Sequence, residues 1–244
     1  MSMPLHEDLS TVWADLPPGA VVRSSRAHHP LVWVSDGAVP DAAQWWKRLY
    51  ADHGRTGLYP VLLEYPDDSF EPRAGQYGAG ADVVEYFRDT WKEQPWPGFT
   101  EWPGLAEPGA AADAEAVGRA AGELADRLVR EGSAGCLALV QVGRGADVPA
   151  AVGWDRMSNR LTPERLSAVL RSWEDRFGLR LVGFGHGSLY LSVAAPPTSV
   201  DQAHILTAEH YLACLDAFYV DPTMDWDTYP AELMERRDWW LWWD

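Results

Sequence analysis

The sequence predicts an α+β protein in which a C-terminal ferredoxin-like βαββαβ domain follows a smaller, mixed α/β N-terminal region. Two observations predict this class. Apolar residues at helical spacing alternate with short apolar runs, and a segment rich in proline and glycine, residues 94–112, divides the chain. We therefore expect an N-terminal region at residues 1–93, a connector at 94–112 and an α+β domain at 113–244.

The N-terminal region combines predicted strands with predicted helices. Residues 31–35 and 58–65 are apolar runs typical of strands. Pro60 favours an edge position for the second run, because proline cannot donate to a strand ladder. Residues 40–50 carry apolar side chains at helical spacing, and residues 81–91 form a second expected helix.

The helices of the C-terminal region have recognisable ends. Asp113 can cap a helix that ends before Gly132. Thr162, followed by a proline, starts another helix that stops at Gly178. Ser199 lies three residues before a glutamine, so a capping box opens a helix that we expect to run to about residue 218.

Strands occupy the intervals between these helices. A turn of Gly185, His186 and Gly187 joins two of them as a hairpin, and the expected strands are residues 135–142, 179–184, 188–193 and the tryptophan segment 239–243. The order from residue 135 onward is β-α-β-β-α-β. This order predicts the ferredoxin-like arrangement, in which helices cover one face of an antiparallel sheet.

Composition and charge exclude several classes of function. The 244 residues include 36 acidic and 20 basic residues, which gives a formal charge of −16 that repels phosphate backbones and anionic lipid. No run of about 18 apolar residues could span a bilayer, and residues 1–15 lack the features of an export signal. We therefore expect a cytoplasmic protein with no nucleic-acid and no membrane partner, whose Cys136 and Cys214 are two buried thiols.

The end of the chain is both acidic and aromatic. Residues 216–244 hold eight acidic and two basic residues, and four tryptophans lie among the last six residues. Because so apolar a terminus is costly to expose, we expect it to be docked. The combination of carboxylates and aromatic rings suits a cationic surface, so the candidate partner-binding residues are Asp221, Asp225, Trp226 and Asp227.

One group of residues could carry chemistry. His210 and Cys214 are four residues apart on an expected helix and so share a face, and Glu209 or Asp216 could orient the imidazole of a thiolate–imidazole pair. The same pair could supply two zinc ligands, with the others from distant residues such as His204 or His186. We favour a third interpretation, in which a buried thiol packs beside a hydrogen-bonded histidine.

A second motif is the Gly143-Arg144-Gly145 loop, which follows a predicted strand. Its main-chain amides and guanidinium could hold an anion, but the residues that follow are not expected to begin a helix and no Lys-Ser/Thr pair follows. A plain turn is the favoured interpretation. The sequence therefore predicts no bound cofactor and no resident metal.

Several spaced motifs together resemble the DUF4253 family over roughly residues 135–244. They are the Gly143–Asp147 loop, Trp154, residues 173–178, Pro196-Pro197, residues 208–211 followed by Cys214 and Asp216, and the closing Trp-Trp-Asp. The chain departs from the pattern at Leu215, where we expect the family to favour proline. The family is a domain of unknown function, so the resemblance implies a fold unit and no activity.

Two hypotheses of function follow from these residues. The first is an acidic protein that binds a basic protein partner, as immunity-type proteins neutralise a basic toxin or effector; this is an analogy based on charge. The alternative is a small hydrolase or transferase that uses Cys214 and His210. The sequence leaves the partner, the substrate and the oligomeric state open.

Overall fold

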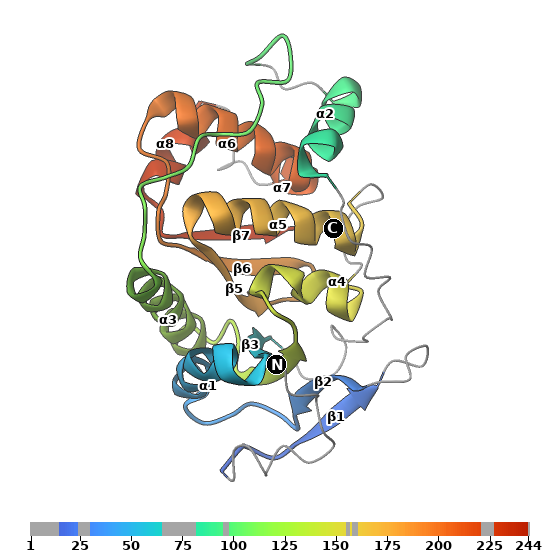
Figure 1. Cartoon of the computed structure of the whole chain (residues 1–244), viewed down its shortest axis with the longest axis vertical. Helices are drawn as coiled ribbons and strands as arrows, with labels where there is room; N and C mark the ends of the chain where they lie inside the picture. Colours follow the sequence, from blue (N-terminus) through green and yellow to red (C-terminus); the bar gives the residue numbers. More distant parts are fainter. Residues whose placement is uncertain are drawn as a thin grey trace.

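The computed structural model describes residues 15–23, 30–64, 82–94, 98–154, 157, 161–220 and 227–243. Within these residues seven strands form one mixed sheet, and helices pack on both of its faces (Figure 1), so the α+β class is confirmed. The strands are β1 (Gly19–Arg23), β2 (Pro30–Ser35), β3 (Leu58–Leu63), β4 (Cys136–Gln141), β5 (Leu179–Phe184), β6 (Ser188–Val193) and β7 (Asp238–Trp242). The α-helices are α1 (Ala42–Thr56), α2 (Val83–Glu93), α3 (Ala114–Arg130), α4 (Val148–Val152), α5 (Pro163–Phe177), α6 (Val200–Ala213), α7 (Leu215–Val220) and α8 (Tyr229–Glu235).

The ferredoxin-like arrangement is not confirmed. The sheet order is β1-β2-β4-β3-β5-β6-β7, so β3 lies between the first two strands of the expected βαββαβ unit. β3 pairs antiparallel with β4 and parallel with β5, whereas β5, β6 and β7 form an antiparallel meander. Strands from either side of the 94–112 connector therefore share one sheet, while the boundaries of the predicted domains stay a prediction.

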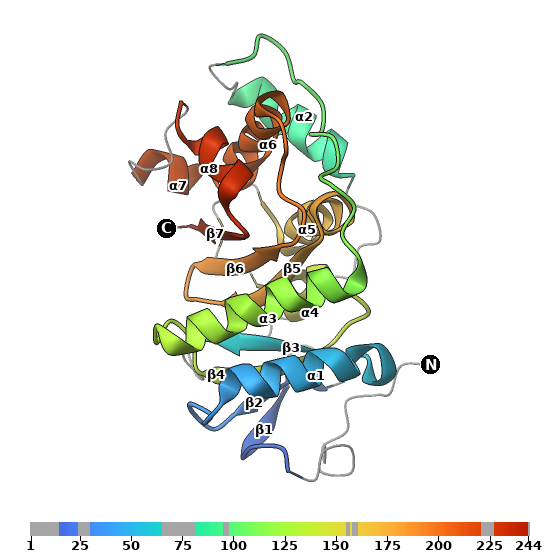
Figure 2. The same ribbon diagram turned by 90° about the vertical axis from the view of Figure 1, so that its left-hand side faces the viewer.

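The expectation that helices cover one face of the sheet is wrong. α1 and α3 pack on one face, over a cluster that includes Leu58, Leu137 and Val182. α5, α6 and the remaining helices contribute to the cluster on the other face, with strand residues such as Val61 and Leu181. Figure 2 shows α1 and α3 in front of the sheet. Alternation of side chains along each buried strand supplies both faces with apolar residues.

Pro60 does not mark an edge strand, because β3 lies near the centre of the sheet. Pro60 is opposite Leu139 of β4, but the ladder with β5 covers only Leu62 and Leu63. Pro60 therefore precedes the residues of β3 that pair with strands on both sides, so its missing N–H costs no bond in the ladder with β5.

The helix expected to run to about residue 218 is interrupted. α6 ends at Ala213, and Cys214 leaves the helical region with φ −138° and ψ 64° before α7 begins at Leu215. The capping box was correctly placed, because Ser199 Oγ accepts the N–H of Gln202 at 3.2 Å. Both cysteines are buried free thiols, and no helix among the described residues is long and apolar enough to cross a membrane.

The C-terminal tryptophans dock as the edge strand β7, as the sequence predicts for an apolar terminus. Trp239, Leu241 and Trp243 point into the core, where each is at most 2% exposed. Trp240, between them, is 45% exposed. Neighbouring tryptophans on one strand thus occupy opposite environments, because successive side chains alternate between the two faces of a sheet.

We expect Trp239→Ala to lower the free energy of unfolding by about 3–5 kcal/mol, the cost of emptying a large buried aromatic site. Trp240→Ala is the matched control, since the same side chain is removed from a largely solvated position. Its expected cost is below about 1 kcal/mol. Urea unfolding followed by circular dichroism measures both, and equal costs for the two variants would contradict the burial pattern.

Candidate functional site

Helix α5 carries the polar side chains of two separate clusters. The helix forms because Thr162 Oγ1 accepts the N–H of Arg165 at 3.3 Å, Pro163 takes the first helical position, and Gly178 ends the helix at φ 60°. These local signals confirm the boundaries predicted from the sequence. Because successive residues of a helix point in different directions, its last turns serve a buried cluster on one side and a partly exposed cluster on the other.

The buried cluster is centred on the carboxylate of Glu209, which is fully buried in α6. Arg176 donates to Oε1 at 2.8 Å and to Oε2 at 2.6 Å. Trp173 Nε1 donates to Oε2 at 2.8 Å, and the main-chain N–H of Ala106 donates to Oε1 at 2.7 Å. Each oxygen therefore accepts two hydrogen bonds, and these bonds link α6 to α5 and to the connector segment.

His210 lies next to this cluster in an aromatic environment. Its Nδ1 is 2.8 Å from Tyr229 Oη, while Nε2 is buried without a hydrogen-bond partner. The ring centroids of Trp173 and Trp239 lie 4.8 Å and 4.5 Å from that of His210. Burial, together with the nearby Arg176 charge, lowers the pKa of His210 to about 3, so the imidazole is neutral at physiological pH.

The thiol of Cys214 is hydrogen-bonded to the main chain of the edge strand β7. Its Sγ donates to the carbonyl oxygen of Trp242 at 2.8 Å, and the N–H of Trp242 donates to Sγ at 3.3 Å. Burial raises the pKa of the Cys214 thiol to about 12, which keeps it protonated. The thiol thus covers outward-facing main-chain groups of β7 that an edge strand otherwise leaves open.

The structure places Glu209 and His210 in the last turns of α6 and Cys214 directly after its end, all three buried, but gives each side chain a different partner. Glu209 binds Arg176, His210 binds Tyr229 and Cys214 binds Trp242. A protonated, enclosed thiol is a poor nucleophile. The catalytic roles of the three residues stay a prediction, and the geometry favours the interpretation in which they pack and position. Among the described residues, no group of three His, Cys, Asp or Glu side chains could hold a metal ion.

The predicted partner-binding residues are only partly within the described structure. Asp221, Asp225 and Trp226 lie outside the described residues, whereas Asp227 is exposed just before α8. Their role in binding stays a prediction.

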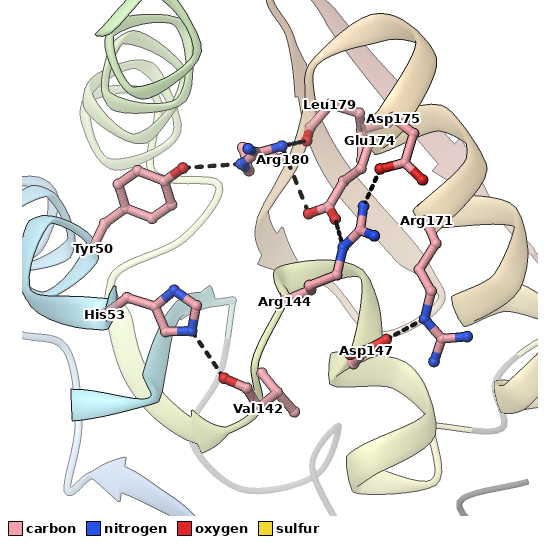
Figure 3. Close-up of polar contacts among 10 residues, drawn as sticks. All are labelled: Tyr50, His53, Val142, Arg144, Asp147, Arg171, Glu174, Asp175, Leu179 and Arg180. Carbon is pink, nitrogen blue, oxygen red and sulfur yellow. Dashed lines mark hydrogen bonds and ion pairs between the residues drawn. The ribbon is translucent and has the colours of Figure 1, made fainter. Parts of the chain in front are cut away.

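The second cluster lies where β4 ends and β5 begins, and Figure 3 shows its polar contacts. Arg144, on the loop after β4, donates through Nε to Glu174 at 2.7 Å and through an Nη atom to Asp175 at 2.6 Å. Arg180 of β5 lies 3.7 Å from the other oxygen of Glu174 and donates to Tyr50 Oη at 2.9 Å. The chain of contacts therefore runs from α1 through β5 and α5 to the loop.

Two further contacts hold the same loop. Arg171 of α5 pairs with Asp147, which lies in the 3₁₀ turn η2 (Gly145–Asp147). His53 Nε2 donates to the carbonyl oxygen of Val142 at 2.8 Å, which places the imidazole proton on Nε2. With both acidic partners in place, the guanidinium of Arg144 is neutralised, so it is not available to an anion as the alternative interpretation of this loop required.

The loop itself is shaped by its second glycine. A Cβ on Gly145 would lie 2.3 Å from the ring of Tyr59, whose Oη donates to the carbonyl of Leu181 at 2.7 Å. Contrary to the expectation from the sequence, helical residues do follow, first η2 and then α4. Pro149 stands in the first turn of α4, a favourable place for proline that could have indicated a helix start.

Sequence reasoning missed Arg144, Glu174, Arg176 and Arg180 as members of polar clusters. Arg171 and Glu174 lie three residues apart on α5, a spacing that brings side chains onto a common helix face and could have indicated a charged face. Their partners Asp147 and Arg144 lie 24 and 30 residues away in the chain, a separation that no local pattern reveals.

The described surface exposes few large apolar side chains. They are Val200 at 59%, Tyr219 at 72% and Trp240 at 45%. Two of the three are aromatic, of the kind that contributes strongly to protein interfaces.

We expect Glu209→Ala to destabilise the fold by about 3–5 kcal/mol, because it leaves Arg176 buried without its counter-charge. Asp175→Ala is the matched control, since it removes the 65% exposed carboxylate of a surface pair, at an expected cost of at most about 1 kcal/mol. Thermal and urea unfolding measure both. Similar losses for the two variants would show that Glu209 does not hold the helices together.

The neutral state of His210 predicts a pH dependence of stability. The folded-state pKa of about 3 lies below the ordinary 6.5, so only the unfolded chain gains this proton between these values. The contribution of His210 to the free energy of unfolding is therefore largest above pH 6.5 and falls by up to ~1.4 kcal/mol per pH unit as the pH drops toward 3.

The His210→Asn variant should lose this component of the slope, while the control His186→Asn, at an exposed turn position, should keep it. Unfolding titrations of all three proteins above pH 4.5 isolate the effect, because the carboxylates are common to them. The same slope in His210→Asn and wild type would contradict the assignment.

Comparison with known proteins relates part of this architecture to a family. No curated protein and no solved structure matches the chain. The model of one family matches residues 136–244, which begin at β4 and include α5, α6 and β7 together with Arg144, Glu174, Glu209, His210 and Cys214. The C-terminal part of the chain thus matches the family DUF4253, described as a domain of unknown function, which confirms the resemblance seen in the sequence.

Proposed function

We propose that this protein binds a basic partner protein, with immunity-type neutralisation of a basic toxin or effector as the model for its role. The observation that carries the proposal is the exposure of Tyr219 and Trp240 on a chain of formal charge −16. Exposed aromatic side chains supply contact area, while excess negative charge accelerates encounter with a cationic surface and disfavours anionic ones.

The environment of Cys214 supports binding over the alternative, a Cys/His-dependent hydrolase or transferase. A nucleophile must be ionised and must reach its substrate, whereas this thiol is buried, protonated and bonded to Trp242. Glu209 is not free to orient His210, because its carboxylate already accepts from Arg176, Trp173 and the main chain.

The acidic segment before α8 belongs to the proposed binding region. Asp221, Asp225, Trp226 and Asp227 combine three carboxylates with one aromatic ring within seven residues. Asp227 is exposed at the start of this part of the described chain. We assign these residues to the electrostatic part of the recognition.

Affinity capture of the intact protein from its own cells, eluted with a salt gradient and identified by mass spectrometry, tests the proposal. We expect a stoichiometric basic partner that salt releases, with an affinity on the order of tenfold weaker after Asp225→Lys and Asp227→Lys are combined. The Cys214→Ser variant should retain the partner, because a serine hydroxyl can also donate to Trp242. Contacts unchanged by charge reversal at low salt would refute the electrostatic mechanism, and loss of an enzymatic activity in Cys214→Ser would favour the alternative.

A further inference from the structure

Among the described residues, no helix covers part of one face of the sheet beside α3. In Figure 2, α1 and α3 lie in front of the lower strands, and β6 and β7 continue beyond α3 with no helix in front. Helix α3 is fastened at this border by the ion pair of Arg127 with Asp238, at 2.7 Å. The side chains on this face alternate with the buried ones of Trp239, Leu241 and Trp243, so Trp240 and Trp242 point outward.

Tyr190 and Trp240 form a cross-strand pair on the uncovered face. They are direct partners in the ladder of β6 with β7, and the next pair on the same face toward the chain end is Ser188 with Trp242. Trp240 is exposed, whereas Tyr190 and Trp242 are half-buried. Three aromatic side chains therefore lie in adjacent positions of two hydrogen-bonded strands.

The tyrosine ring of this pair is fixed before any partner arrives. Tyr190 Oη donates to Glu64 Oε1 at 2.7 Å, across the neighbouring β5. Gly183 of β5 is opposite Tyr190, and a Cβ there would lie 3.4 Å from the ring and 3.0 Å from the carbonyl oxygen of Leu62. Burial, and then the bond to Glu64, raises the pKa of Tyr190 to about 12, so the hydroxyl stays a donor and holds the ring in place.

Carboxylates border the aromatic face. Glu64 lies at one side of Tyr190, and Asp238 lies along β7 at the border with α3. Asp238 pairs with Arg127, and the exposed Arg236 and Arg237 precede it in the chain, so the attraction of a cation rests on Glu64 and on the net charge of the chain. Two copies of a chain with formal charge −16 repel each other, so charge favours a cationic occupant over a second copy.

The chemistry of the face selects among cations. A guanidinium stacks on an aromatic ring and loses less hydration than an ammonium does, so aromatic surfaces prefer arginine to lysine. The chain uses this contact elsewhere, with Arg48 over Trp45 at 5.0 Å and Arg165 over Tyr86 at 5.5 Å. Among the described residues, no arginine or lysine of the chain lies over the ring of Trp240.

We propose that the uncovered face of β6 and β7, with Trp240 beside Tyr190 and Trp242, binds an arginine-bearing segment of a protein partner by stacking of guanidinium groups on its aromatic rings. This inference rests on the proposed function and specifies the surface and the side chain that the partner presents. Trp240 makes the central contact, Tyr190 is held ready by Glu64, and Glu64 together with the net charge of the chain attracts the cation.

Titration with oligo-arginine and oligo-lysine peptides of equal length, followed by calorimetry at low salt, tests the surface. Wild type is expected to bind oligo-arginine more tightly than oligo-lysine. Trp240→Ala should lower the affinity for oligo-arginine about two- to fivefold, as expected for loss of an exposed cation–π contact, and should remove the preference for arginine. Val200→Ala, which truncates another exposed apolar residue and leaves the charge unchanged, is the matched control and should bind as wild type does.

The other outcomes overturn the inference in distinguishable ways. Equal binding of both peptides by Trp240→Ala and wild type would refute this surface and leave the proposed function standing. No binding of either peptide by folded wild type at low salt would contradict both. A wild-type dimer in sedimentation that becomes monomeric in Trp240→Ala would identify a second copy as the occupant, which refutes the arginine-bearing partner.

Discussion

The pairing of β3 on both of its sides is the constraint on which the rest of the fold depends. β3 joins β4 on one side and β5 on the other, and all six of its residues are buried. Because the strand comes from the part of the chain before the connector, main-chain hydrogen bonds tie that part to the C-terminal elements. Tyr59 of β3 adds a side-chain bond to the carbonyl of Leu181, and its ring fixes where the Gly145 loop can lie.

Buried polar groups then decide which chemistry the interior allows. Glu209 accepts hydrogen bonds from four donor groups, while His210 stays neutral because burial and the Arg176 charge lower its pKa. The same enclosure keeps Cys214 protonated. Glu209, His210 and Cys214, whose residue types suggest catalysis in the sequence, therefore form hydrogen bonds that join helices to one another and to the edge strand.

Features set by neighbouring residues, such as helix ends, can be predicted from the sequence, whereas contacts between residues that are distant in the chain cannot. The bounds of α5 follow from Thr162, Pro163 and Gly178, which act within the helix itself. The spacing of His210 and Cys214 was also informative, since both lie on one buried stretch. Their environments depend on Tyr229 and Trp242, 19 and 28 residues further along, and the position of β3 depends on strands more than 70 residues away. Such contacts follow from the sheet order, which helix and strand patterns do not specify.

Alternation along β7 links the stability of this fold to its proposed role. A strand that directs Trp239 and Trp243 into the core must direct Trp240 and Trp242 to the other face. Stability explains the inward pair, since their burial removes large apolar surfaces from water, but it does not explain an outward indole that is 45% exposed. A smaller or polar side chain at position 240 would preserve the strand at less cost in exposed apolar surface. The proposed contact outside the chain would cover this outward indole, and the acidic charge of the protein favours a cation as its occupant.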